Sequence, residues 1–316
     1  MSQDKLWEEL YRSMLRVRRV EEKIIDVYWS DKIKSPVHLS IGQEAVATGV
    51  CEAFEPEDIL FATYRSHHAY LAKGGDMNAM IAELYGKVTG CARGKGGSMH
   101  LIDPEHGVAG TSAVVGTTIA NALGYAFAVK LRKEKKVVAV FFGDGAVDEG
   151  VFHESINFAA LKQLPILFVC ENNQFAVHSP HITRRLEDNL IDRAGVYGVP
   201  AQRIEGNDVL AIHKQTVKAV ESIRRGEGPQ FLECMTYRWK EHVGPGDDFH
   251  LGYRTPEEMQ PWIDDDQLTR AERELDADVA STIKAEVEIE VTQAFEFAEE
   301  SPFPDASELY AHVYAD

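Results

Sequence analysis

The sequence is poor in cysteine and in positive charge, and each shortage excludes a class of protein. Four cysteines occur among 316 residues, with no paired spacing, so we expect free buried thiols rather than disulfides or a zinc site. Lys and Arg total 33 against 51 Asp and Glu, which gives a formal net charge of −18. That charge argues against nucleic acid or an anionic membrane as a partner.

Long hydrophobic runs are absent too. No stretch of about 18 apolar residues occurs, so no membrane span is expected. The opening residues, MSQDKLWEEL, have neither the apolar core of a secretory leader nor the Arg- and Ser-rich character of a transit peptide. We therefore expect a cytoplasmic location. With 44% apolar and 27% charged residues, the composition is that of an ordinary soluble globular protein.

The stretch from Lys136 to Asn173 indicates how the chain is built. Residues 137–142 form a near-continuous apolar run, which is typical of a strand buried on both faces of a parallel sheet. Residues 149–162 have apolar side chains at helical spacing, and residues 166–170 form a second buried-strand run. This is the pattern of a strand–helix–strand unit with a right-handed crossover. We therefore predict an α/β fold, with a mostly parallel sheet and helices on both faces.

Polar residues follow each of these two strands. Gly143-Asp144-Gly145 comes after the first strand, and Asn172-Asn173 comes after the second. In an open parallel sheet the carboxyl ends of the strands form the edge where ligands bind. A carboxylate and an amide oxygen at that edge suit Mg²⁺ on a diphosphate, and glycine N–H groups can approach phosphate oxygens. Gly-Asp-Gly alone would indicate a turn, but the asparagine pair after a second buried strand favours a ligand site.

The rest of the chain predicts further elements around this unit. In chain order they are an amphipathic helix (6–29), a short strand (58–64), a helical pattern rich in small residues (110–130), a polar loop (174–189), two strands (202–204 and 229–236) with a helix between them (208–224), and a long acidic helical stretch (267–299). Apolar residues recur at four-residue steps in the last stretch, so this chain or a partner must cover them.

Five glycines between Gly86 and Gly97 suggest a nucleotide-binding loop at first sight. Three residues separate Gly90 from Gly94-Lys95, and Gly96 follows, whereas a P-loop needs four residues there and then Ser or Thr after the lysine. The sequence therefore predicts a tight glycine corner at this point.

These motifs together resemble a known family. Gly143-Asp144-Gly145 with Asn172-Asn173 is similar to the thiamine-diphosphate signature. The longer stretch of sequence from HLSIGQEA to GYRTPEE resembles the α subunit of thiamine-dependent 2-oxo acid dehydrogenases, including pyruvate, branched-chain and acetoin members. The resemblance covers residues 6–262. It implies the diphosphate-binding half of a thiamine-diphosphate fold over residues 1–262, with a C-terminal helical extension at 263–316 that packs on this domain or on a partner.

The resemblance also implies roles for individual residues. Asp144, Asn173 and the carbonyl of Phe175 would bind Mg²⁺, and His67 and His242 would be catalytic. Arg65 would meet the diphosphate, for which its bidentate geometry is suited. The full set of expected cofactor-binding residues is Tyr64, Arg65, Ala113, Val115, Asp144, Gly145, Ala146, Asn173, Phe175 and His242.

The chain lacks an evident half for the pyrimidine ring of thiamine diphosphate, and no room for a second sheet domain remains after residue 262. The resemblance therefore implies a β subunit that supplies this half and the activating carboxylate. It also implies a heterotetramer of two α and two β chains, and a lipoyl-bearing acyltransferase as the acyl acceptor.

The implied reaction is decarboxylation of a pyruvate-like 2-oxo acid, followed by transfer of the acyl group to a lipoyl carrier. Val243 stands where many members of the resembled family carry a serine, and the Gly-Pro-Gly-Asp-Asp that follows departs from the usual text. Cleavage of acetoin or a related hydroxyketone with the same cofactor is therefore an alternative. A non-catalytic subunit of the same fold is a third reading, and the completeness of the expected site argues against it.

Overall fold

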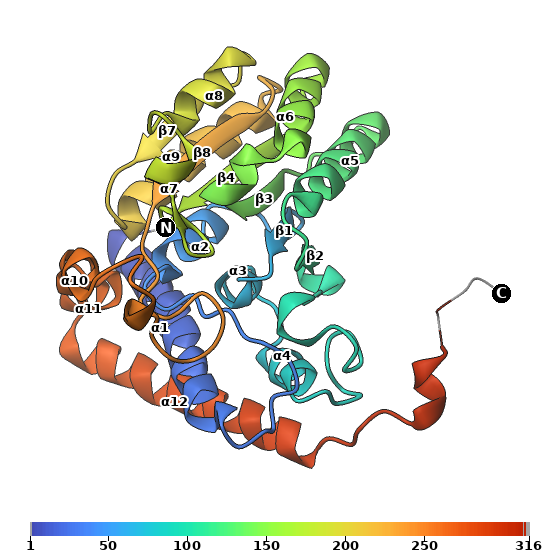
Figure 1. Ribbon diagram of the computed structural model, residues 1–316, viewed down its shortest axis with the longest axis vertical. Coiled ribbons are helices and arrows are strands. Elements are labelled where there is room, and N and C mark those ends of the chain that lie inside the picture. Colours follow the sequence, from blue (N-terminus) through green and yellow to red (C-terminus); the bar gives the residue numbers. More distant parts are fainter. Residues whose placement is uncertain (1, 312, 314–316) are drawn as a thin grey trace.

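The sheet in the computed structural model, which describes residues 2–311 and 313, has six strands that are all parallel (Figure 1). Their order across the sheet is β2-β1-β3-β4-β8-β7. The bounds are β1 Ile59–Thr63, β2 Val108–Ser112, β3 Val138–Gly143, β4 Ile166–Asn172, β7 Ala201–Ile204 and β8 Gln230–Met235. The predicted α/β class is confirmed, and β3 and β4 occupy the centre of the sheet.

Successive side chains of the central strands point to opposite faces of the sheet, so two separate hydrophobic cores form. Val138, Val140 and Phe142 of β3 face one side of the sheet, where residues of α5 (Thr117–Arg132), α6 (Gly150–Lys162) and α8 (Leu190–Val196) cover them. Ala139 and Phe141 face the other side. Both faces are buried, which is why β3 reads as a continuous apolar run.

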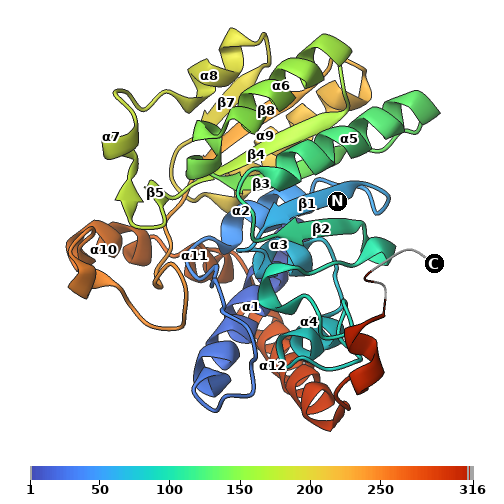
Figure 2. The same cartoon turned by 45° about the vertical axis from the view of Figure 1, so that its right-hand side comes forward.

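Helices on the second face form the larger core (Figure 2). They are α1 Gln3–Tyr28, α2 Glu44–Cys51, α3 His67–Ala72, α4 Met77–Leu84, α9 Val209–Arg224 and α12 Ala277–Glu300. Two shorter helices, α10 Pro256–Asp264 and α11 Gln267–Arg273, precede α12. The four cysteines are all free, as predicted.

Three segments differ from the prediction. Residues 108–112 form edge strand β2, which the sequence hides because Val-Ala-Gly-Thr-Ser has few of the bulky residues typical of strands. The stretch 267–299 is two helices: the first ends at Arg273, and Asp276 caps the start of α12 by accepting a hydrogen bond from the N–H of Asp278. The polar loop at 174–189 contains a short hairpin, β5 Phe175–Ala176 with β6 Ser179–Pro180, and helix α7 His181–Arg184.

The apolar stripe of α12 is covered by this chain itself. Ile283, Val287 and Val291 belong to the larger core, and α12 packs against α1 and α4. After α12 the chain is tied to the glycine corner, since the N–H of Val88 donates to the carbonyl of Pro302 at 3.0 Å. The C-terminal segment therefore packs on the same helices that support the sheet, while a domain boundary at residue 262 stays a prediction.

The glycine corner is organised by one carboxylate. Glu83 accepts hydrogen bonds from the backbone N–H groups of Ala92 and Gly94 at 2.8 Å, and of Gly96 and Gly97 at 2.7 and 3.0 Å. A Cβ on Gly90 would lie 2.4 Å from Glu83 Oε2, so glycine is required there. The corner binds a carboxylate of its own chain in the way that other loops bind a phosphate.

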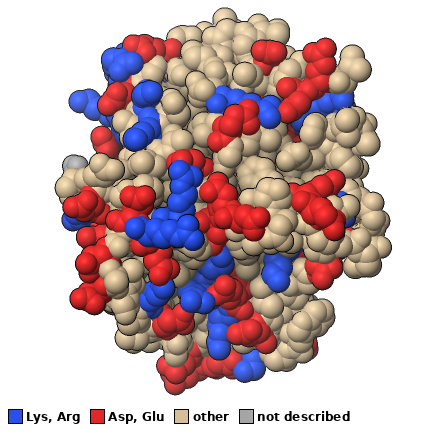
Figure 3. Space-filling model, turned by 90° about the vertical axis from the view of Figure 1, so that its left-hand side faces the viewer, with Lys and Arg blue, Asp and Glu red and all other residues tan. Residues whose placement is uncertain are grey.

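Charged groups of both signs are mixed on the surface. On the face that Figure 3 shows, acidic side chains interrupt the basic ones, in keeping with the net charge of −18. Among the described residues, no helix is long and apolar enough to cross a membrane.

Replacing Ile283 with Ala should lower the free energy of unfolding by about 2–5 kcal/mol, because the substitution leaves a cavity between α12 and the core. Ile289 of the same helix is 56% exposed, whereas Ile283 is 2% exposed. Ile289→Ala is therefore the matched control and should change stability by less than about 0.5 kcal/mol. Urea denaturation would measure both, and equal losses would show that α12 does not depend on this core contact.

Candidate active site

The strand register brings the two predicted metal ligands to one edge of the sheet. Gly143, the last residue of β3, pairs with Glu171 of the neighbouring parallel strand β4. Asp144 follows β3 and Asn173 follows Asn172, the last residue of β4, so both lie at the carboxyl edge, on adjacent strand ends. This is the position at which open parallel sheets bind ligands.

A cavity of about 210 Å³ opens at this edge. Its walls come from the residues after β1, from the turn before α5, from the ends of β3 and β4, and from the loop after β8. The residues that line it are Gln43, Thr63, Tyr64, Arg65, Val115, Gly143, Gly145, Ala146, Glu149, Glu171, Asn173, Phe175, Ala176, Val177 and His242. Eight of the predicted site residues are in this set, namely Tyr64, Arg65, Val115, Gly145, Ala146, Asn173, Phe175 and His242.

Asp144 is fully buried, next to the wall residues Gly143 and Gly145. Its Oδ1 has no hydrogen-bond partner among the described residues, while its Oδ2 accepts hydrogen bonds from Arg184 and Arg185. Burial raises the pKa of Asp144, although both arginines act to lower it. A buried carboxylate oxygen with no partner costs free energy unless a ligand satisfies it, so this atom fits a cation site.

Asn173 is held in place by hydrogen bonds on both sides of its amide. Its Nδ2 donates to Gln43 Oε1 at 3.0 Å, and its Oδ1 accepts from the N–H of Phe175 at 3.2 Å. The amide oxygen keeps a second lone pair for another ligand. Gln43 thereby joins the site through Asn173.

Arg65 is a buried cation that bonds only to neutral acceptors. It donates to the carbonyls of Leu39 and His242, the latter at 3.0 Å, and it forms no ion pair among the described residues. Burial and the charge of Arg238 lower the pKa of Arg65 to about 10. A guanidinium held in this way on a cavity wall fits an anion such as a diphosphate.

Two histidines near Arg65 are held in the neutral form. The rings of His38 and His242 lie 5.2 Å apart, and Tyr64 packs against both. Burial and the charges of Arg65 and Arg238 lower the pKa of His242 to about 3. Burial, Arg65 and His242 lower the pKa of His38 to about 2. At neutral pH His242 can therefore accept a proton.

The loop that carries His242 is tethered to the core. The N–H of Gly244 donates to the carbonyl of Val37 at 2.8 Å. Buried Asp248 accepts hydrogen bonds from Arg238 at 2.9 Å and from Arg254 at 2.6 Å. Two arginines on one buried carboxylate fix the path of the loop and the position of His242.

Besides Asp144, two of the predicted residues are absent from the cavity wall. His67 is fully buried, with Nδ1 3.0 Å from Glu21 Oε1 and Nε2 2.8 Å from Ser98 Oγ. Ala113 lies in the turn before α5, next to the wall residues but not among them. Their roles stay predictions, and any action of His67 on a ligand would pass through its neighbours.

Glu171 lines the cavity and was missed by the sequence analysis. Its Oε1 lies 2.5 Å from Nε2 of buried His68, whose Nδ1 lies 3.0 Å from Ser40 Oγ. Burial acts to lower the pKa of His68, but the charge and hydrogen bond of Glu171 together with the charge of Glu21 raise it overall. The signal that could have revealed Glu171 is its place directly before the asparagine pair, at the tip of a buried strand.

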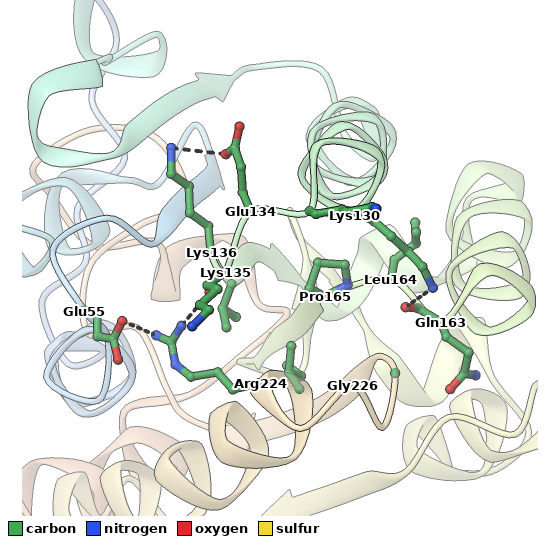
Figure 4. Close-up of a pocket in the computed structure, with 14 residues that line it drawn as sticks. Glu55, Lys130, Glu134, Lys135, Lys136, Gln163, Leu164, Pro165, Arg224 and Gly226 are labelled. Carbon is green, nitrogen blue, oxygen red and sulfur yellow. Dashed lines mark hydrogen bonds and ion pairs between the residues drawn. The ribbon is translucent and has the colours of Figure 1, made fainter.

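A larger cavity, about 550 Å³, lies at the opposite edge of the sheet (Figure 4). It is lined by basic side chains, but two of them already donate hydrogen bonds to other groups of the protein. Lys130 Nζ donates to the carbonyls of Lys162 and Gln163, and Arg224 donates to Lys135 O at 2.8 Å and to Asp58. These cations already have partners, so the smaller cavity is the better candidate for an active site.

Comparison with known proteins decides the family. The family model described as "Dehydrogenase E1 component" matches residues 12–307. The chain belongs to this family. The dehydrogenase E1 family depends on thiamine diphosphate, so the predicted cofactor is confirmed at family level.

Relatives of this E1 chain are similar over almost their whole length. The α subunit of acetoin:2,6-dichlorophenolindophenol oxidoreductase from Bacillus subtilis is 38% identical over 98% of this chain and 93% of its own. The pyruvate dehydrogenase E1 α subunit of Porphyra purpurea is also 38% identical, over 97% of this chain and 92% of its own. That of Zymomonas mobilis is 37% identical over 96% and 87%.

His38 and His242 should remain neutral well below the pH at which histidine ordinarily titrates, near 6.5. The unfolded chain takes up these protons near pH 6.5 and the folded chain does not, so the contribution of both groups to stability should fall as pH falls from about 6.5 to 3. Imidazole ¹⁵N NMR shifts between pH 8 and 5 would test this, with the His242→Asn variant to assign one signal. Titration of either ring near pH 6.5 would contradict the expected burial.

Proposed function

We propose that this chain is the α subunit of a thiamine-diphosphate-dependent dehydrogenase that decarboxylates a pyruvate-like 2-oxo acid and passes the acyl group to a lipoyl carrier. One observation carries the proposal. Arg65, a buried cation on the cavity wall with only neutral acceptors, lies at the same sheet edge as Asp144, whose buried Oδ1 has no partner among the described residues. A diphosphate with a divalent cation supplies the missing partner to each.

In this proposal the chain binds the polar end of the cofactor. Asp144 Oδ1, Asn173 Oδ1 and the carbonyl of Phe175 hold Mg²⁺, a cation that prefers oxygen ligands. Arg65 and the backbone of Gly145 and Ala146 bind the diphosphate. Thiamine diphosphate, when bound, would supply the nucleophilic carbon that adds to the carbonyl of the substrate and the electron sink that stabilises the negative charge left by decarboxylation.

Proton handling falls to the histidines of the chain. His242 is half-buried on the cavity wall and neutral, so it can accept or return a proton at the reacting centre. His67, buried against Glu21, acts through its contacts with α1 and with Ser98. Tyr64 packs against His242 and limits the access of water.

The remaining parts of the proposal concern partners and location. A β subunit supplies the pyrimidine-binding half and the activating carboxylate, in a heterotetramer of two α and two β chains, and a lipoyl-bearing acyltransferase accepts the acyl group. The designation of the relatives as α subunits supports the β partner. A cytoplasmic location stays a prediction.

Acetoin is the second candidate substrate. The Bacillus subtilis relative is named for acetoin, and the loop after His242 departs from the familiar text at Val243. Reduction of 2,6-dichlorophenolindophenol by the complex, with pyruvate, branched 2-oxo acids and acetoin compared in parallel, would separate the two. A non-catalytic subunit would give no reduction with any of them.

Asp144→Ala in the complex with the β partner should lower the affinity for thiamine diphosphate in the presence of Mg²⁺ by more than tenfold, an effect above about 1.4 kcal/mol, and abolish turnover. Titration calorimetry measures the affinity. Asp192→Ala, at an exposed aspartate of α8, is the control and should leave both unchanged. An Asp144→Ala complex that binds the cofactor as tightly as the wild type would refute the metal assignment.

The isolated chain should show no turnover, because one half of the cofactor site is on another subunit. Activity should appear when the β partner is added in equal amount. The assay is dye reduction with the substrate that the complex prefers. Full turnover by the isolated chain would contradict a site shared between subunits.

A further inference from the structure

A pair of arginines that the sequence analysis assigned to a polar loop contacts the predicted metal ligand. Arg184, the last residue of α7, reaches both Asp144 Oδ2 and Asp148 Oδ2. Arg185 donates to the main-chain carbonyl of Asp144, and its Nε lies 3.2 Å from Asp148 Oδ1. Arg193 adds a third guanidinium, 3.0 Å from Asp148 Oδ1.

The charge of this cluster has the wrong sign for a free cation. Three guanidinium groups surround two carboxylates, which leaves a formal charge of +1 beside the atoms expected to hold Mg²⁺. A divalent cation at Asp144 Oδ1 would meet two guanidinium groups on the other oxygen of the same carboxylate, in a buried setting where screening is weak. The cation therefore needs further negative charge, which a diphosphate carries.

The two arginines that touch Asp144 differ in their freedom. The side chain of Arg185 is fully buried and bonds to the main chain of Asp144 as well as to its carboxylate. The side chain of Arg184 is 16% exposed. A Cβ added to Gly145, a cavity-wall residue, would lie 3.9 Å from Arg184 Nη1. Arg184 thus lies next to a residue of the cavity wall and, being partly exposed, can leave Asp144 without breaking the core.

Arg184 is also linked to a predicted metal ligand through its own segment. Phe175 in β5 pairs with Pro180 in β6, and α7 follows directly at His181. The N–H of His181 donates to the carbonyl of Gln174 at 2.8 Å. The hairpin that presents the carbonyl of Phe175 therefore leads directly into the helix that carries Arg184.

We propose that Arg184 is a resident counter-ion of Asp144 that prevents the site from taking up a divalent cation alone, and that it gives up this carboxylate when cation and diphosphate bind together. This inference rests on the proposed function, because it concerns the same cation site. Its effect is to couple metal binding to diphosphate binding. Arg185 remains in place and keeps the orientation of Asp144.

The test uses the complex with the β partner and Mn²⁺ as the probe, since the electron paramagnetic resonance signal of free Mn²⁺ reports binding directly. Without thiamine diphosphate, the wild type should bind Mn²⁺ weakly, and the cofactor should tighten binding by at least about tenfold. The Arg184→Gln complex should bind Mn²⁺ alone at least about tenfold more tightly than the wild type, because a repelling charge is removed.

Two further variants separate charge from structure. Arg184→Lys keeps the positive charge and should behave like the wild type. Arg193→Gln removes a guanidinium that contacts Asp148 only, and should change Mn²⁺ affinity much less than Arg184→Gln. Hydrogen exchange of residues 178–186 gives a readout without substitution, and should increase when Mn²⁺ and thiamine diphosphate are added to the wild type.

Equal or weaker Mn²⁺ binding by a folded Arg184→Gln complex would overturn the proposal and make Arg184 a positioning residue. If that variant fails to assemble, the wild type decides: in a complex that titration calorimetry shows to bind thiamine diphosphate, Mn²⁺ binding that is equally tight with and without this cofactor also overturns the proposal. Failure of the proposed function looks different. The wild type would then bind no thiamine diphosphate, while the gain of Mn²⁺ binding in Arg184→Gln would still appear.

Discussion

The carboxyl edge of this sheet depends on one constraint, the parallel pairing of β3 with β4 in a fixed register. Because Gly143 pairs with Glu171, the turns that follow β3 and β4, which contain Asp144 and Asn173, lie at the same edge of the sheet. A shift of one residue would exchange the two buried faces of β3 and change which residues of the two strand ends stand beside each other. Two dry cores hold the register, so the same packing that stabilises the fold also places the polar groups.

Incomplete pairing of buried charge is the second theme of the site. Among the described residues, Arg65 pairs with no carboxylate and Asp144 Oδ1 has no partner, and His242 is neutral because burial and two nearby arginines lower its pKa. In the loop that carries His242, by contrast, buried Asp248 is fully paired, with Arg238 and with Arg254. The contrast distinguishes residues that await a ligand from residues that hold a loop.

Much of the fold could be predicted because its signals are local. Apolar runs mark β3 and β4, helical spacing marks α6, and the Gly-Asp-Gly and Asn-Asn tips mark the edge that carries the site. Edge strand β2 could not be predicted, since its short side chains leave no period to detect. The break before α12 depends on a capping aspartate within a run of charged residues.

The contacts of the site were harder to predict because they join distant parts of the sequence. Nothing local to Arg184 indicates that it reaches Asp144, forty positions earlier. Similarly, His67 matches a family position, but only the folded chain shows Glu21 and Ser98 on its two ring nitrogens. Charge and motif predict which residue types gather at an edge, whereas tertiary packing decides which of them reach the cavity.

Glu83 gives the glycine corner an anion that is part of the chain. Four backbone N–H groups donate to this side chain. A phosphate or carboxylate from solution would therefore have to displace the carboxylate of Glu83. The chain itself supplies the anion that this turn binds, so the conformation of the turn does not require a bound ligand.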